Sequence, residues 1–195
     1  MNFADAIRPH FVGSENITAT MLDSIVGSAL AVLISVNFIN QNVCVHFMAQ
    51  KSFYVDACIW LNLFKKEGDP TKGSPYWKIA KDFIENIIFS EDKEIFYSGF
   101  VLREMQLKLN NDKLYNEKHT FIREEPKFIF IKAIQEDKVL ARKLESESEF
   151  EISFYDCLHI SICKRTNSVL ITRDNKLIEF AKDYIEVQKP EDLLS

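Results

Sequence analysis

The sequence lacks the cysteine and histidine spacings that are typical of zinc sites and redox-active pairs. Its four cysteines form no C-x-x-C pair, and its four histidines form no H-E-x-x-H pattern. Cys157 and Cys163 are better interpreted as small apolar residues of a buried helix than as ligands or nucleophiles. Unpaired cysteines fit a reducing compartment, so we expect a cytoplasmic protein.

Loops that bind nucleotide phosphates are also missing. The chain contains neither G-x-x-x-x-G-K-[ST] nor G-x-G-x-x-G, which disfavours nucleotide-dependent chemistry. The D-x-D-x-T signature of one large class of phosphatases is absent as well, because Asp56-Ala57-Cys58 stands where it would begin.

Positive charge is scarce. The 24 Lys and Arg residues are outnumbered by 29 Asp and Glu residues, and the formal net charge is −5. This balance argues against a protein that binds nucleic acid through bulk positive charge. It leaves a metal-dependent nuclease open, because clustered carboxylates add to the negative count and bound cations reverse it locally.

No apolar run is long enough to cross a bilayer. The longest candidate, residues 25–36, falls short of the roughly 20 residues that a membrane-spanning helix needs, so we expect no membrane partner. The remaining composition, with 47% hydrophobic and 27% charged residues, is that of a globular protein. We expect residues 1–47 to form an extension outside the catalytic domain, which would then occupy residues 48–195. An upstream start codon is one hypothesis for this extension, since Met48 closely precedes the first clear strand.

Hydrophobic periodicity predicts alternating strands and helices after residue 50. Buried strands are expected at residues 53–55 and 168–172, and further strands at 94–97 and 185–187. Helices are expected at 58–64, 75–88, 99–109 and 176–183. Residues 110–150 are polar and carry both charges, with a helix-like stretch at 136–147. The alternation predicts an α/β fold with a central, mostly parallel sheet of four or five strands flanked by helices.

Four acidic residues stand where apolar elements meet their turns. Asp56 and Asp174 follow predicted strands, whereas Glu104 and Asp156 lie near the starts of predicted helices. In a doubly wound sheet these positions converge outside the carboxyl ends of the strands. Several carboxylates brought together cannot all stay ionised without cations, so the set predicts a site for Mg²⁺ or Mn²⁺. A simpler interpretation remains for Asp156, because Ser153-x-x-Asp156 also fits a helix-capping box.

The four motifs, in this order, resemble those of PIN-domain nucleases, particularly the VapC-type toxins and their archaeal relatives. The matching segments are an apolar strand ending in Asp56, a helix carrying Glu104, the D-x-x-H-I segment that starts at Asp156, and the T-x-D segment that ends at Asp174. The resemblance covers about residues 52–188. It implies a PIN-like three-layer sandwich, hydrolysis of RNA phosphodiester bonds, and a helical arm within residues 110–150 that lines the substrate groove.

The resemblance also assigns roles. Asp56, Asp156 and Asp174 would hold one or two cations, and Glu104 would complete the shell or orient a metal-bound water. Thr172 and Asn175 are either outer-shell partners or turn residues. Arg173 and Lys176 either contact phosphate or face solvent. We interpret His159 as a packing or hydrogen-bonding residue outside the catalytic set. An antitoxin partner and a homodimer are implied in the same way. The alternative is a non-catalytic PIN-like module that binds RNA or protein.

Overall fold

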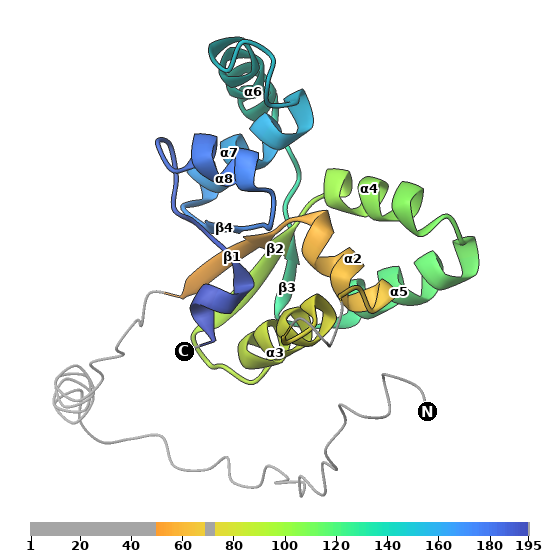
Figure 1. Cartoon of the computed structure of the whole chain (residues 1–195). Helices are drawn as coiled ribbons and strands as arrows, with labels where there is room; N and C mark the ends of the chain where they lie inside the picture. Colours follow the sequence, from red (N-terminus) through yellow and green to blue (C-terminus); the bar gives the residue numbers. More distant parts are fainter. Residues whose placement is uncertain (1–49, 69–72, 195) are drawn as a thin grey trace, which may run out of the picture. The chain divides into compact units, whose positions relative to one another are not determined.

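The computed structural model describes residues 50–68 and 73–194 (Figure 1). The predicted extension, residues 1–47, its boundary at Met48 and the apolar run at 25–36 lie outside the described residues. Within the described part of the chain, no helix has the length and apolar character to cross a membrane.

Five parallel strands form one sheet in the order β3-β2-β1-β4-β5. Their bounds are β1 Lys51–Val55, β2 Lys93–Tyr97, β3 Phe128–Phe130, β4 Val169–Ile171 and β5 Val187–Gln188. The prediction of a mostly parallel sheet of four or five strands is therefore confirmed. Every pair in this sheet is parallel, which explains why its central strands read as continuous apolar runs instead of alternating patterns.

Strands β1 and β4 form the centre of the core. Phe53, Tyr54 and Val55 are buried, and so is every residue of β4. The register pairs Val55 with Ile171, so both strands end at the same level of the sheet. The residues that follow the two strands are therefore brought to the same place.

Helices cover both faces of the sheet, as the three-layer prediction required. Figure 1 shows α2 and α3 on one side and α7 and α8 on the other, while α4 packs on α2 and α5, and α6 packs on α7. The bounds are α2 Ala57–Lys65, α3 Tyr76–Ile88, α4 Gly99–Leu109, α5 Asp112–Glu124, α6 Gln135–Glu147, α7 Phe154–Thr166 and α8 Asn175–Ala181. A short 3-10 helix, η3, covers Pro190–Leu193.

The segment that was hardest to predict, residues 110–150, holds α5, β3 and α6. Only Ile122 of α5 is buried, which is why this helix leaves so weak a periodic signal in the sequence. Asn110 ends α4 in the left-handed conformation, and the Asn111 side chain then accepts a hydrogen bond from the Leu114 amide to start α5. The helix predicted at residues 136–147 is confirmed as α6.

The order in which strands are added to the sheet reverses at the junction between β1 and β4. The chain first moves outward from β1 through β2 to β3, then returns to the other side of β1 for β4 and β5. Such a switch point leaves a crevice outside the carboxyl ends of the two central strands. Asp56 and Thr172 directly follow these strands, so the topology places them at this crevice.

Candidate metal centre

Asp56 lies at the exit of β1 and is 8% exposed. It occupies the N-cap position of α2, but its side chain makes no capping hydrogen bond. The carboxylate instead accepts hydrogen bonds at Oδ2 from the Thr172 hydroxyl (2.7 Å) and from the Cys58 thiol (3.0 Å). Two donors from separate elements therefore fix the orientation of this buried carboxylate.

The Cys58 thiol is held in its neutral, donating form. Burial is the main cause that raises the pKa of this thiol, and the adjacent Asp56 charge raises it further. Cys58 is therefore a hydrogen-bond donor to Asp56 and is no nucleophile at neutral pH.

Glu104 projects from the second turn of α4 and is half-buried. The helix is started by Ser98, whose hydroxyl accepts a hydrogen bond from the Phe100 amide (3.3 Å). Burial raises the pKa of Glu104, and the charges of Asp56 and Asp156 raise it further, whereas His159 lowers it. The carboxyl group of Glu104 is therefore electrostatically disfavoured as an anion in the metal-free protein.

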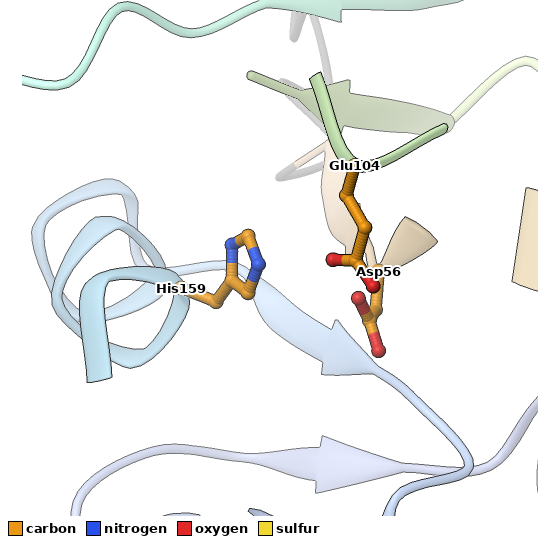
Figure 2. Close-up of side chains that lie close together, drawn as sticks. All are labelled: Asp56, Glu104 and His159. Carbon is orange, nitrogen blue, oxygen red and sulfur yellow. The ribbon is translucent and has the colours of Figure 1, made fainter. Parts of the chain in front are cut away.

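His159 comes to the same crevice from α7 and is 2% exposed. Its Nδ1 is hydrogen-bonded to the hydroxyl of Tyr54 (2.9 Å), and that hydroxyl is also bonded to Ser98 Oγ (2.6 Å). The ring is held from the side that faces the core. This leaves Nε2 on the side of the ring that faces the carboxylates (Figure 2).

Asp56, Glu104 and His159 each offer one ligand atom, and these atoms all lie within 4.8 Å of one another. Figure 2 shows the two carboxylates side by side, with the imidazole opposite them. Ligands at ~2.1 Å from one Mg²⁺ ion can be separated by at most about 4.2 Å. The three ligand atoms thus lie close to or within the separation that one ion allows, and their chemistry fits such an ion.

Asp156 lies near this group, since its charge contributes to the raised pKa of Glu104. It lies outside the 4.8 Å group, however. Its Oδ2 accepts a hydrogen bond from the Ser153 hydroxyl (2.6 Å), and its amide donates to that hydroxyl (3.3 Å). Ser153 therefore caps α7 as predicted, but the Asp156 carboxylate bonds to the Ser153 hydroxyl instead of completing the capping box at the Ser153 amide. The role of Asp156 as a metal ligand stays a prediction.

Asp174 is exposed and caps α8. Its Oδ1 accepts hydrogen bonds from the amides of Lys176 (2.8 Å) and Leu177 (3.2 Å). The Asp174 amide donates to Thr172 Oγ1 (3.2 Å), and that hydroxyl donates to Asp56. Asp174 is thus connected to the centre through Thr172, but the structure does not bring its carboxylate into the 4.8 Å group.

Of the remaining predicted residues, two are exposed and one is held in an ion pair. Asn175 and Lys176 are exposed at the start of α8. Arg173 donates to Glu191 (2.8 Å), and its guanidinium lies 4.2 Å from the centre of the Tyr76 ring. This side chain ties the turn after β4 to η3 and α3. Its Nε and Nη2 are buried without a partner, so a phosphate contact would require the side chain to become more accessible.

His159, expected outside the catalytic set, lies in the group with Asp56 and Glu104. One signal was available: Asp156 and His159 are three residues apart and so share a helix face, and Asp156 was already an expected site residue. The spacing alone does not show that this face meets acids from β1 and α4, which only the fold reveals.

Comparison with known proteins agrees with this architecture. The family model for the PIN domain matches residues 53–183, which include all four predicted acids and His159. The chain belongs to the PIN-domain family. No curated protein sequence matches it significantly.

Solved PIN-domain structures share the fold at low sequence identity. FitAcB from Neisseria gonorrhoeae is 16% identical, with a TM-score of 0.52 over 71% of this chain and 98% of that one. VapBC2 from Rickettsia felis, bound to a fragment of its promoter DNA, is 16% identical, with a TM-score of 0.53 over 71% and 98%. VapC20 from Mycobacterium tuberculosis, a toxin that cleaves the sarcin-ricin loop, is 19% identical, with a TM-score of 0.53 over 70% and 98%.

Proposed function

We propose that this PIN-domain protein is a divalent-metal-dependent endoribonuclease and the toxin of a toxin–antitoxin pair. The observation that carries the proposal is the convergence of Asp56, Glu104 and His159 at the switch point of the sheet. Family membership and the toxin VapC20 among the structural relatives support the same function.

The donor set suits a hard cation, because carboxylate oxygens are the preferred protein ligands of Mg²⁺ and Mn²⁺. Asp56 and Glu104 would hold the ion, with His159 at its edge and Asp156 and Asp174 as further candidates through water. A bound cation of this kind supplies a more acidic water and neutralises charge on the phosphate. In the proposed reaction the chain itself orients the ligands, since Thr172 and Cys58 fix Asp56 and Tyr54 fixes His159.

The proposed partners follow from the same function. RNA is the substrate, a small antitoxin protein would block the crevice, and two copies of the chain would form a homodimer. These partners rest on the resemblance to toxins of this family, and a cytoplasmic location follows from them.

Cleavage of RNA by the purified protein tests the proposal. We expect the wild type to cut tRNA or other structured RNAs in Mg²⁺ or Mn²⁺, and EDTA to stop the reaction. Asp56→Asn and Glu104→Gln should each abolish cleavage, because each removes a charge that a cation needs as a ligand. Matched controls are Asp112→Asn and Glu124→Gln, which neutralise exposed acids on α5.

Two results would contradict the proposal. Cleavage that survives in both site variants would remove these acids from the reaction. A wild type that binds no Mn²⁺ in a calorimetric titration and cuts no RNA would instead favour the non-catalytic module.

For the toxin role, expression of the wild type, but not of Asp56→Asn, should arrest bacterial growth.

A further inference from the structure

Aromatic side chains gather beside the candidate metal centre, on the elements that carry its acids. Phe100 lies one turn before Glu104 on α4, and Tyr155 directly precedes Asp156 on α7. Their ring centres are 5.8 Å apart, with the planes tilted by 44°. The first turns of α4 and α7 therefore meet through two aromatic rings at the edge of the crevice.

The aromatic surface continues along α7, where Phe154 packs edge-on against Tyr155 (5.6 Å). We call Phe100, Tyr155 and Phe154 the aromatic row. It stays accessible, since Tyr155 is 58% exposed. Phe130 from β3 packs instead against Tyr97 (5.5 Å).

A cationic side chain ends the row. The Arg142 guanidinium from α6 lies 4.0 Å from the centre of the Phe154 ring, and its side chain is 66% exposed. One of its nitrogens is paired with Glu145 (2.7 Å), so its charge is partly balanced. The row thus combines a partly exposed aromatic surface with one positive charge, which Glu145 partly balances.

We propose that the aromatic row is a base-binding site, on which an unpaired nucleobase of the RNA substrate stacks next to the scissile phosphate. This inference rests on the proposed nuclease function. Single-stranded RNA is commonly bound by aromatic rings, because every base offers a flat face to stack on. The row adjoins the acids, so a nucleotide whose phosphate lies at Glu104 has its base within reach of Phe100.

The charge of the protein strengthens this inference. A net charge of −5 gives little general attraction for RNA, so affinity depends on local contacts, such as those with a bound cation and with aromatic rings. Stacking provides affinity that does not depend on phosphate contacts and so depends little on salt. An acidic nuclease with a row of rings at its centre can therefore hold a flexible segment of RNA without a basic groove.

Binding of a fluorescein-labelled single-stranded RNA tests the site, measured by anisotropy in the cleavage-deficient Asp56→Asn background. Tyr155→Ala should weaken binding about 5- to 150-fold, the change in Kd that corresponds to ~1–3 kcal/mol per stacked base. Tyr155→Phe should bind as the parent does, because it keeps the ring. Phe100→Leu should weaken binding while preserving apolar volume. Phe89→Ala is the matched control, since Phe89 is 68% exposed at the end of α3.

Two further measurements separate stacking from charge. An RNA with an abasic nucleotide at the position that stacks should bind the parent more weakly, and Tyr155→Ala should remove this difference. The slope of log K against log salt should stay unchanged in Tyr155→Ala, whereas Arg142→Gln should reduce it by about 0.7 if Arg142 contacts one phosphate.

The outcomes distinguish this inference from the proposed function. If the parent binds RNA and the wild type cleaves it, but the ring variants bind as tightly as the parent, the base-binding site is refuted and the nuclease stands. If RNA affinity is unchanged while Tyr155→Ala dissociates an oligomer in light scattering, the row is a protein interface instead. If the wild type neither binds nor cuts RNA, both proposals fail together.

Discussion

Replacing Thr172 by Val removes one hydroxyl from the heart of the candidate centre while keeping the shape of the side chain. Thr172 is fully buried. Its hydroxyl donates to Asp56 Oδ2 (2.7 Å) and accepts from the Asp174 amide (3.2 Å). The substitution therefore deletes the link between the two strand-end acids.

The loss can be estimated from these two contacts. A hydrogen bond to a charged group contributes ~1.5–3 kcal/mol, and Asp56 is too buried for water to replace the donor easily. The Cys58 thiol still donates to the same oxygen, which limits the loss. Asp174 is exposed, so water can take over its amide at little cost. We expect Thr172→Val to lower the free energy of unfolding by about 2–3 kcal/mol, a large share of the ~5–15 kcal/mol typical of a domain.

Urea unfolding at pH 7 in EDTA measures this loss. Thr172→Ser keeps the hydroxyl and should lose less than Thr172→Val. Thr120→Val is the matched control, since Thr120 is exposed on α5. Combining Thr172→Val with Asp56→Asn completes a double-mutant cycle, in which a coupling energy of about 1 kcal/mol or more is expected because the charged partner is gone. Additive effects, or a Thr172→Val variant as stable as the wild type, would refute the role assigned to this hydroxyl.

Three further predictions concern the charges of the domain. Because the folded-state pKa of Glu104 is raised above its ordinary value of 4.5, the native state holds this proton more tightly than the unfolded state. Stability of the metal-free protein should therefore fall as the pH rises from 4.5 through the folded pKa, and Glu104→Gln should flatten this dependence in urea titrations. Asp56→Asn should be about as thermally stable as the wild type in EDTA, because relief of repulsion with Glu104 offsets the weaker hydrogen bonds from Thr172 and Cys58; a much lower Tm would contradict this. Arg165→Met should lower the free energy of unfolding by about 2–3 kcal/mol in urea, because it strips both guanidinium contacts (2.8 and 2.9 Å) from Asp137, which is 3% exposed; Lys164→Met, at an exposed neighbour, is the control.

The sequence predicted the parts of this fold that are encoded locally. The runs around Val55 and Ile171 identified the two central strands, and the Ser153 cap located the start of α7 to the residue. These signals are strong because burial on both sides of a sheet and a helix start each impose residue types over a few neighbouring positions.

The composition of the centre was harder to predict, because it depends on contacts between distant elements. The acids at Asp156 and Asp174 follow the motif, yet neither carboxylate joins the group in the structure: Asp156 accepts from the Ser153 hydroxyl, and Asp174 caps α8. His159 enters the centre through its bond to Tyr54, 105 residues away in the chain. Arg173 is drawn to Glu191 by the position of η3, which no local pattern foretells.

The centre is organised before any cation arrives, and this organisation has an electrostatic cost. Thr172 and Cys58 hold Asp56, and the bonds from Ser98 through Tyr54 to His159 tie the cap of α4 to the imidazole. The same arrangement buries Glu104 and holds it close to the negative charges of Asp56 and Asp156, and both the burial and this repulsion raise its pKa. A divalent cation relieves that repulsion without a rearrangement of the ligands. The electrostatic repulsion in the metal-free state therefore increases the affinity for the ion. Fixed ligand geometry and unfavourable charge are thus two consequences of one switch-point topology.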